Sequence, residues 1–224
     1  MKSELAPVCK AFELTRSDER ADGSVGDIEI VAMLTGIGMV PAKAAAERAL
    51  ATDPDHVMIC GIAGGIDASL GIGDMIWPAV VVDKHAGTEH TPSPLPGITP
   101  SGRLVSSDDF TVTDEDIAAL RADGVIAVDM ETGAIAAACD AAGVPWTTFR
   151  AISDRAGETP TAVLGLANPD GSANVKNVAK FLVTKPHKIG LLGKLAKGAQ
   201  AAATNAATTA RAHCTNVVMK DRTS

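Results

Sequence analysis

Residues 125–154 read VIAVDMETGAIAAACDAAGVPWTTFRAISD and hold two apolar runs separated by an alanine-rich segment. The runs at 125–128 and 146–152 have the length and the branched side chains of buried strands, and the segment between them has the composition of a helix. Strand, helix and strand in this order form the repeating unit of an α/β protein with a parallel or mixed sheet. A carboxylate follows each run, Asp129 or Asp154, so the same stretch marks a candidate site.

The alternation of strands and helices continues through most of the chain. The pattern predicts strands at 28–34, 56–65, 73–83 and 103–110, helices at 2–14, 41–51, 113–122 and 130–142, and a mostly helical tail over 175–224. Pro78 indicates an edge or a bulge in its strand, Thr113 or Asp114 caps its helix, and the proline- and glycine-rich segment 87–102 is a surface loop. We expect one α/β domain over 1–224, in which a mixed central sheet is flanked by helices and the tail packs on it.

Composition excludes several classes of protein. The 224 residues are 46% hydrophobic and carry a formal charge of −7, which argues against nucleic acid as a partner because phosphate binding needs a clustered basic face. No apolar segment approaches the roughly 20 residues of a membrane span. The cysteines form no C-x-x-C pair, which indicates a reducing, cytoplasmic location and no metal centre. They are Cys9, Cys60, Cys139 and Cys214.

The segment 191–212 leaves two interpretations open. Its apolar residues have helical spacing and several of its neighbours are basic, as in a helix that lies on a membrane surface. It has no large apolar residue after Leu195, where alanine and threonine dominate. This composition favours a helix that packs on its own domain.

Three carboxylates follow predicted strands. In open α/β sheets, ligands bind outside the carboxyl ends of the strands, so Asp129, Glu131 and Asp154 are placed to converge on one pocket. Acidic residues at helix N-termini are also stabilising in their own right, which offers a structural alternative. For Asp129, capping and function remain equally open. For Asp154, which follows Ser153 at a strand end, function is favoured.

Four stretches together carry a family resemblance. They are LTGIGMVPAKAA (34–45), GIAGGIDASLGIGDMI (61–76), SSDDF (106–110) and AVDMETGAIAAACDAAGVPWTTFRAISD (127–154). In this order and spacing they resemble the purine nucleoside phosphorylase and nucleosidase superfamily, and they are most similar to its methylthioadenosine/S-adenosylhomocysteine nucleosidase branch. The tail FLVTKPHKIGLLGKLAKGAQAA (181–202) resembles the hopanoid-associated members, which are thought to remove adenine from a lipid-linked adenosyl group.

The resemblance implies a nucleoside phosphorylase-like fold and an enzyme that cleaves the N-glycosidic bond of a purine nucleoside. The expected reaction is hydrolysis of a 5′-substituted adenosine, in which the sugar becomes cationic and the departing adenine gains negative charge. Asp154 matches the family's aspartate that donates to the purine ring, and Ser153 would orient it. The stretch MKSEL (1–5) resembles the family's AMEEEV, which makes Glu4 the general base that activates water.

The remaining site residues come from the same resemblance. Glu131 matches the glutamate that binds both ribose hydroxyls, Met130 would pack beneath the sugar, and Phe110 would stack on the purine. Arg150 would lie near the nucleophile end of the site, and Gly64 would let the backbone approach the ligand. No cofactor and no metal ion are implied.

The chain departs from the family pattern in three places. Family members have a strand before the AMEEEV segment, and the sequence shows none there, so either translation begins upstream or the sheet lacks a strand. Ile62 occupies a position where nucleosidases of this branch commonly carry a hydroxyl near the attacking water. The loop 87–102 lacks the helix that members usually carry there.

Several alternatives remain open. A phosphate-dependent phosphorylase of the same fold is the nearest one, and a nucleoside-binding protein that has lost catalysis is another. A dinucleotide oxidoreductase is disfavoured, because TGIGMVPA (35–42) is not the expected G-x-G-x-x-G fingerprint. We further expect a homodimer, with Trp77 and residues 80–82 as an apolar surface. The sequence leaves the 5′ substituent open, and also whether a partner subunit completes the site.

Overall fold

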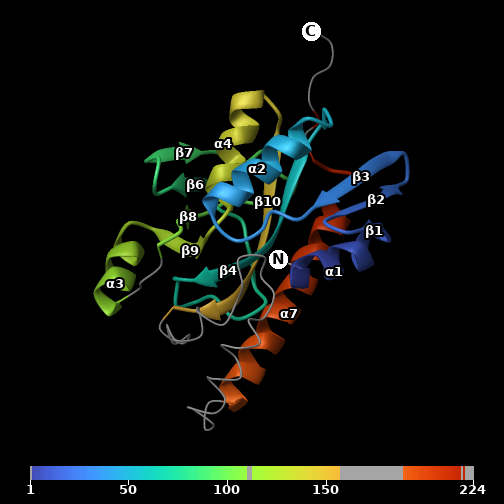
Figure 1. The fold of residues 1–224 in the computed structure, drawn as a ribbon. Coiled ribbons are helices and arrows are strands. Elements are labelled where there is room, and N and C mark those ends of the chain that lie inside the picture. Colours follow the sequence, from blue (N-terminus) through green and yellow to red (C-terminus); the bar gives the residue numbers. More distant parts are fainter. Residues whose placement is uncertain (1, 110–112, 157–188, 218, 220–224) are drawn as a thin grey trace.

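A computed structural model describes residues 2–109, 113–156, 189–217 and 219. The helices in this part of the chain are α1 (Lys2–Phe12), α2 (Met39–Leu50), α3 (Asp114–Ala122), α4 (Thr132–Ala142) and α7 (Ile189–His213). The strands are β1 (Thr15–Ser17), β2 (Arg20–Val25), β3 (Ile28–Met33), β4 (Val57–Gly65), β5 (Met75–Ile76), β6 (Val80–Asp83), β7 (Thr88–His90), β8 (Arg103–Ser106), β9 (Val125–Asp129) and β10 (Trp146–Arg155). Figure 1 shows how these elements are arranged.

Seven strands form the main sheet, in the order β5-β10-β4-β9-β8-β6-β7. The pairs β4–β10, β8–β9 and β6–β8 are parallel. The pairs β5–β10, β4–β9 and β6–β7 are antiparallel. The sheet is therefore mixed, and the predicted α/β fold class is confirmed.

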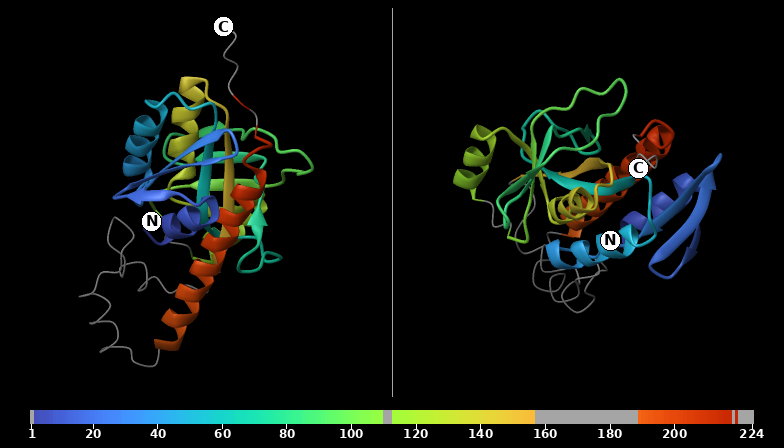
Figure 2. Two further views of the ribbon diagram at one scale, coloured as in Figure 1. Left: turned by 90° about the vertical axis from the view of Figure 1, so that its right-hand side faces the viewer. Right: turned by 90° about the horizontal axis from the view of Figure 1, so that it is seen from above.

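Helices cover both faces of this sheet (Figures 1 and 2). On one face α2 packs with α4, and residues such as Ala46 and Ile135 join Ile59 and Ala63 of β4 in one core cluster. On the other face α1 packs with α7 against β4 and β10. Because β4 is covered on both sides, it is apolar at nearly every position, as buried strands of α/β proteins are.

A separate three-stranded antiparallel sheet, in the order β1-β2-β3, lies beside α1 (Figure 2). A tight turn at Gly26 and Asp27 joins β2 to β3, and Gly26 supplies the positive φ of 59° that such a turn needs. The predicted strand 28–34 is confirmed as a strand, but it pairs only with β2 and does not belong to the main sheet.

The single strand predicted over 73–83 is wrong, because the structure divides it into β5 and β6. Pro78 lies between the two, where its missing N–H interrupts a ladder. β5 pairs with β10 at one edge of the sheet, whereas β6 pairs with β8 and β7 near the opposite edge. Of the apolar surface expected here, Val81 is fully buried, and the ring of Trp77 packs edge-on against Phe149 with centroids 5.6 Å apart, whereas Val80 and Val82 are partly exposed.

Other boundaries also differ from the prediction. The loop expected over 87–102 contains β7, and α4 begins at Thr132 and not at residue 130. β10 continues past its apolar run through Ser153 to Arg155, with an irregular register between Ile152 and Asp154. This extension places the backbone of Ser153 and Asp154 inside the sheet.

The helix α7 packs along β10, β4 and α1. From Gly193 onward, where its side chains are described, those that are buried are all small, which lets the helix approach the sheet closely. They are Ala202, Ala203, Ala206, Ala207 and Ala210. Of the two interpretations of this segment, packing on the domain is the one observed. Among the described residues, no helix combines the length and apolarity needed to cross a membrane.

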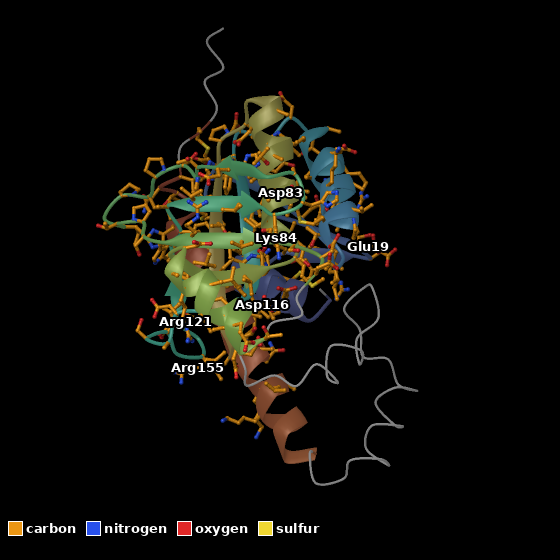
Figure 3. All side chains as sticks on the ribbon, turned by 90° about the vertical axis from the view of Figure 1, so that its left-hand side faces the viewer. Glu19, Asp83, Lys84, Asp116, Arg121 and Arg155 are labelled. Atoms are coloured by element: carbon orange, nitrogen blue, oxygen red, sulfur yellow. The ribbon has the colours of Figure 1, made fainter. Side chains whose placement is uncertain are left out.

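The helix α3 is fixed at both ends. At its start, Thr113 forms a capping box with Asp116, whose backbone N–H donates to the threonine hydroxyl at 3.1 Å. Near its end, Arg121 donates from Nε to the carbonyl of Ile66 at 2.6 Å, beyond the carboxyl end of β4. Figure 3 labels Asp116 and Arg121. The predicted cap at Thr113 is thus confirmed.

Candidate active site

Arg150 is the centre of a buried group of charges. β10 carries this side chain into the interior, where the residue is only 4% exposed. Its Nη2 lies 2.8 Å from Oδ2 of Asp129 and 3.5 Å from Oε2 of Glu131, and its Nη1 lies 3.9 Å from Oε1 of Glu4. Three carboxylates from distant parts of the sequence therefore meet at one guanidinium.

Asp129 is the most fully bonded of these carboxylates. Its Oδ1 accepts hydrogen bonds from Ser106 Oγ at 2.5 Å and from the backbone N–H groups of Thr132 and Glu131 at 3.3 and 3.4 Å. Its Oδ2 accepts from the Thr132 hydroxyl and pairs with Arg150. Asp129 thus caps α4 and also holds Arg150, so the two roles that the sequence left open coexist.

Glu131 lies at the N-cap position of α4 and accepts a hydrogen bond on Oε1 from the backbone N–H of Gly38 at 3.1 Å. Gly38 has φ of 100°, and a Cβ on it would lie 2.8 Å from Oδ1 of Asp108, so this contact needs glycine. Burial raises the pKa of Glu131 to about 7; Arg150 opposes this rise and the neighbouring carboxylate of Asp129 adds to it. Glu131 therefore holds a proton at a higher pH than an exposed glutamate does.

Glu4 is held at the end of β4. Its Oε1 accepts from the backbone N–H of Ile62 at 3.0 Å, and Arg150 Nη1 donates to the carbonyl of Ile62 at 3.2 Å. The side chain of Ile62 packs instead against the cluster formed with α7. The absence of a hydroxyl at this position therefore leaves the Glu4–Arg150 contact intact.

Gly61 leaves room for the side chains of Arg150 and Glu4 to lie next to β4. A Cβ at Gly61 would lie 2.2 Å from Nη1 of Arg150 and 2.6 Å from Oε1 of Glu4, so any side chain there would displace the pair. Burial disfavours the charged guanidinium of Arg150, but its carboxylate neighbours outweigh burial and raise its pKa. Arg150 consequently stays charged throughout the range in which Glu131 titrates.

Asp154 lies near the end of β10. Ser153 Oγ donates to its Oδ1 at 2.5 Å and also contacts the carbonyl of Ala63 at 3.3 Å. Across the sheet, Asp154 pairs in register with Gly64 of β4, which pairs in turn with Val128 of β9. Gly64 thus separates Asp154 from the segment that carries Asp129 and Glu131.

A cleft of about 780 Å³ reaches the charge cluster and is lined there by Glu4, Glu131 and Arg150. Ser153 and Asp154 do not line it. Of the predicted site residues, the structure therefore brings Glu4, Glu131 and Arg150 together and places the Ser153–Asp154 pair separately.

Met130 is half-buried between Asp129 and Glu131, and Phe110 lies outside the described residues. Sequence reasoning missed four residues of the cluster: Ser106, Thr132, Gly61 and Gly38 in its contact to Glu131. All four lie in the motifs quoted for the resemblance, but only the fold shows their contacts. Within the described residues, no group of three or more His, Cys, Asp or Glu side chains is placed to hold a metal ion.

Comparisons with known proteins identify the family of this chain. A family model described as the phosphorylase superfamily matches residues 2–100 and 98–185. A 5′-methylthioadenosine/S-adenosylhomocysteine nucleosidase of Exiguobacterium sp. is 31% identical over 172 residues, which cover 61% of this chain and 72% of that relative. The resemblance drawn from the four stretches is confirmed.

Solved structures share the fold at lower identity. The 5′-methylthioadenosine/S-adenosylhomocysteine nucleosidase of Helicobacter pylori matches with a TM-score of 0.69 and 20% identity, covering 97% of this chain and 95% of that one. The futalosine hydrolase of Helicobacter pylori matches with a TM-score of 0.62 and 21% identity, covering 93% of this chain and 94% of that one. These likenesses establish the fold.

Proposed function

This chain belongs to the phosphorylase superfamily, and we propose that it hydrolyses a 5′-substituted adenosine and releases adenine. The observation that carries the proposal is the group of carboxylates around Arg150 at the cleft. The nucleosidase of Exiguobacterium sp. and the nucleosidase fold of the structural neighbours support the same reaction class.

The charge balance of the cluster favours water over phosphate as the nucleophile. A phosphate site needs unpaired positive charge, whereas Arg150 already faces Asp129, Glu131 and Glu4. A phosphate dianion at this position would be repelled by carboxylates in a poorly hydrated setting. Water meets no such repulsion, and Glu4 is the carboxylate that we propose as its general base.

Glu131 is proposed to bind the ribose. A carboxylate can accept hydrogen bonds from both vicinal hydroxyls at once, and its negative charge stabilises the cationic sugar of the transition state. Arg150 would fix the direction of both Glu4 and Glu131, since it contacts each from the same guanidinium. Met130, which lies between Asp129 and Glu131 in the chain, would pack beneath the sugar.

Asp154 is proposed to protonate the departing adenine, with Ser153 holding its carboxyl group in position. β4 lies between the backbone of Asp154 and that of Val128, so the two are two strand spacings apart, which is roughly 10 Å. This interval leaves room for a base next to Asp154 and a sugar next to Glu131. Gly64 lies between them and offers only backbone to a ligand, while Phe110 remains the proposed stacking partner of the purine.

One assay tests the reaction. The protein is incubated with 5′-methylthioadenosine, with and without inorganic phosphate, and free adenine and the sugar product are separated and identified. We expect adenine and free 5-methylthioribose in both conditions at equal rates. Adenine release that requires phosphate, together with 5-methylthioribose 1-phosphate, would identify a phosphorylase. Binding of the nucleoside without adenine release would identify a binding protein.

The assembly and location are further parts of the proposal. The homodimer rests on the family resemblance, and sedimentation at micromolar concentration tests it, with a monomer as the opposing result. The cytoplasmic location is supported by the cysteines, since Cys9, Cys60, Cys139 and Cys214 are all free thiols.

A further inference from the structure

The loop 66–74 follows β4 and is bonded to β10 just before Asp154. The backbone of Ile152 makes two of these bonds: its N–H donates to the carbonyl of Asp74 at 2.9 Å, and its carbonyl accepts from the N–H of Gly73 at 2.7 Å. They continue the antiparallel pairing of β5 with β10. The end of the loop therefore fixes the last regular position of β10 ahead of the proposed proton donor.

The chain around the loop is also bonded to β10 just after Asp154. Nε of Arg155, which Figure 3 labels, donates to the carbonyl of Leu70 at 2.9 Å. The backbone N–H of Ala156 donates to the carbonyl of Gly65 at 2.8 Å, where β4 passes into the loop. Asp154 consequently lies between two places at which β10 is held, so a shift of the loop moves the backbone that carries this carboxyl group.

The strand itself is irregular at this point. The register of β10 against β4 shifts between Ile152 and Asp154, and Ser153 falls outside it. A bulge of this kind turns the side chains that follow it in a new direction. Because the ladder is interrupted here, contacts from outside the strand contribute more to the direction of Asp154 than they would along a regular strand.

The helix α7 holds the loop from the other side. Asn205 donates from Nδ2 to the carbonyl of Gly73 at 2.7 Å. Gly73 has φ of 93°, which glycine adopts without strain, and it is bonded on both sides: its N–H to β10 and its carbonyl to α7. Earlier in α7, Gly198 lies so close to β10 that a Cβ there would be 3.1 Å from the carbonyl oxygen of Ser153. The helix thus lies directly against the irregular segment and is bonded, through Asn205, to the loop that braces it.

From these contacts we propose that Asn205 is a positioning residue for Asp154, an inference that rests on the proposed role of Asp154 as the proton donor to adenine. Asn205 is an exposed residue of α7, and a substitution at such a place would ordinarily have little effect. Its amide acts through Gly73 and Ile152, and it keeps the loop against β10 so that the carboxyl group points at the base. A proton donor that is turned away slows the chemical step and leaves substrate binding nearly unchanged.

The first test compares the two kinetic constants for adenine release from 5′-methylthioadenosine. Asn205→Ala removes the donor to Gly73, and kcat should fall about tenfold while KM stays within about twofold. Asn205→Asp keeps the shape of the side chain but replaces the donor with an oxygen, so it should lose at least as much. Thr204→Ala is the matched control, because its exposed hydroxyl donates to the carbonyl of Gln200 within the same helix, and it should keep full activity.

The second test asks whether the effect passes through Asp154. Asn205→Ala is combined with Asp154→Asn, and kcat is measured for the unaltered chain, the two single variants and the double variant. If Asn205 acts by directing the carboxyl group, its substitution should change kcat less than about twofold once that group can no longer transfer a proton. A role in general stability would lower kcat by the same factor in both backgrounds. Thermal unfolding shows whether each variant is folded at the assay temperature, and Asn205→Asp replaces the alanine variant if that one is not.

Three results would overturn the positioning role: full turnover by Asn205→Ala, an equal loss in Thr204→Ala, or an undiminished loss when Asn205→Ala is added to Asp154→Asn. Failure of the proposed function gives a different pattern. If the unaltered chain releases no adenine, or if Asp154→Asn releases it at the normal rate, Asp154 is not the proton donor and the positioning role fails with it. A loss in Asp154→Asn with full turnover by Asn205→Ala, in contrast, overturns the positioning role alone.

Discussion

Asp129 and Asp154 each follow an apolar run in the same stretch of sequence, but the two carboxylates have different surroundings in the fold. Asp129 is 5% exposed, accepts hydrogen bonds from two hydroxyls and two backbone N–H groups, and pairs with a buried arginine. Asp154 is half-buried near the end of β10, next to the Ser153 hydroxyl that donates to it. A carboxylate that is buried and held by several protein donors supports the structure, whereas a less buried one near the end of a strand can serve a ligand.

A carboxylate at the end of a strand can be structural or catalytic, and the sequence alone does not separate the two roles. The partners that fix Asp129 come from β8, α4 and β10, so its role depends on the pairing of strands far apart in the chain. We infer that Asp129 positions Arg150, and that Arg150 positions Glu4 and Glu131. Asp154, in contrast, is proposed to touch the substrate. The following predictions separate these roles.

The largest effect is expected from Asp154→Asn. Asparagine keeps the size of the side chain but cannot transfer a proton to adenine, so kcat should fall by about two to four orders of magnitude while KM changes little. Adenine release from 5′-methylthioadenosine is the measurement. Asp123→Asn, on an exposed residue at the end of α3, is the matched control and should keep full activity. Near-normal turnover by Asp154→Asn would make this carboxylate a structural one.

Asp129→Asn should act on stability first. It removes the charge that pairs with buried Arg150 at 2.8 Å and leaves the guanidinium less compensated. We expect the free energy of unfolding to fall by about 2–4 kcal/mol, near the low end of values for broken buried ion pairs because Asn keeps one acceptor oxygen. Urea denaturation measures this change, and Asp154→Asn serves as the control with a change below about 1 kcal/mol. Equal losses in the two variants would contradict the difference between the two carboxylates.

Glu131 predicts a pH dependence of stability. Its pKa of about 7 in the folded protein lies above the ordinary value of 4.5, so the folded state binds more protons than the unfolded state between these pH values. The free energy of unfolding that this residue contributes is therefore highest below pH 4.5 and falls as the pH rises to 7. Relative to Glu131→Gln, the unaltered protein should lose about 1–3 kcal/mol over this interval.

Urea denaturation at several pH values tests this dependence. The difference between the unaltered protein and Glu131→Gln should change steadily between pH 4.5 and 7 and level off above pH 8. In the adenine assay, Glu131→Gln should also raise KM and lower kcat together, since a ribose contact is lost. A difference in stability that does not vary with pH would show that Glu131 ionises normally.

The smallest effect is expected from Gly61→Ala. Its new methyl group would meet Nη1 of Arg150 and Oε1 of Glu4 at less than 3 Å, so the pair must shift. We expect a loss of about 1–2 kcal/mol in stability. Gly64→Ala is the matched control on the same strand, because its Cβ would contact Val128 at an ordinary 3.4 Å. Thermal unfolding that ranks Gly64→Ala below Gly61→Ala would contradict the crowding at Arg150.

The sequence predicted β9, α4 and β10 well because two apolar runs flank an alanine-rich segment there. It missed β1 and β2, whose residues 15–25 are short, polar and glycine-containing and carry no strong strand signal. It also placed β3 in the main sheet, because an apolar run does not reveal which strand it pairs with. Pro78 indicated an edge or a bulge, but the sequence did not predict that 73–83 divides into two strands.

For the site, motif resemblance identified Glu4, Glu131 and Arg150, which the structure brings together. It could not identify Ser106 as a donor to Asp129, because these residues lie 23 positions apart and meet only through the pairing of β8 with β9. Gly61 was missed for a similar reason: its need for a hydrogen side chain comes from Arg150 on the adjacent strand. Nonlocal contacts, and not local propensity, decide these roles.

We infer that Asp154 acts on the leaving base, whereas Asp129 acts through the fold. The most direct measurement compares each variant's activity on two substrates, 5′-methylthioadenosine and the corresponding 5-methylthioribose with a p-nitrophenyl leaving group, which departs without protonation. Asp154→Asn should lose about two to four orders of magnitude in kcat on the adenosine but less than about tenfold on the p-nitrophenyl substrate, whereas Asp129→Asn should lose the same factor on both. Equal losses on both substrates for Asp154→Asn would contradict the account.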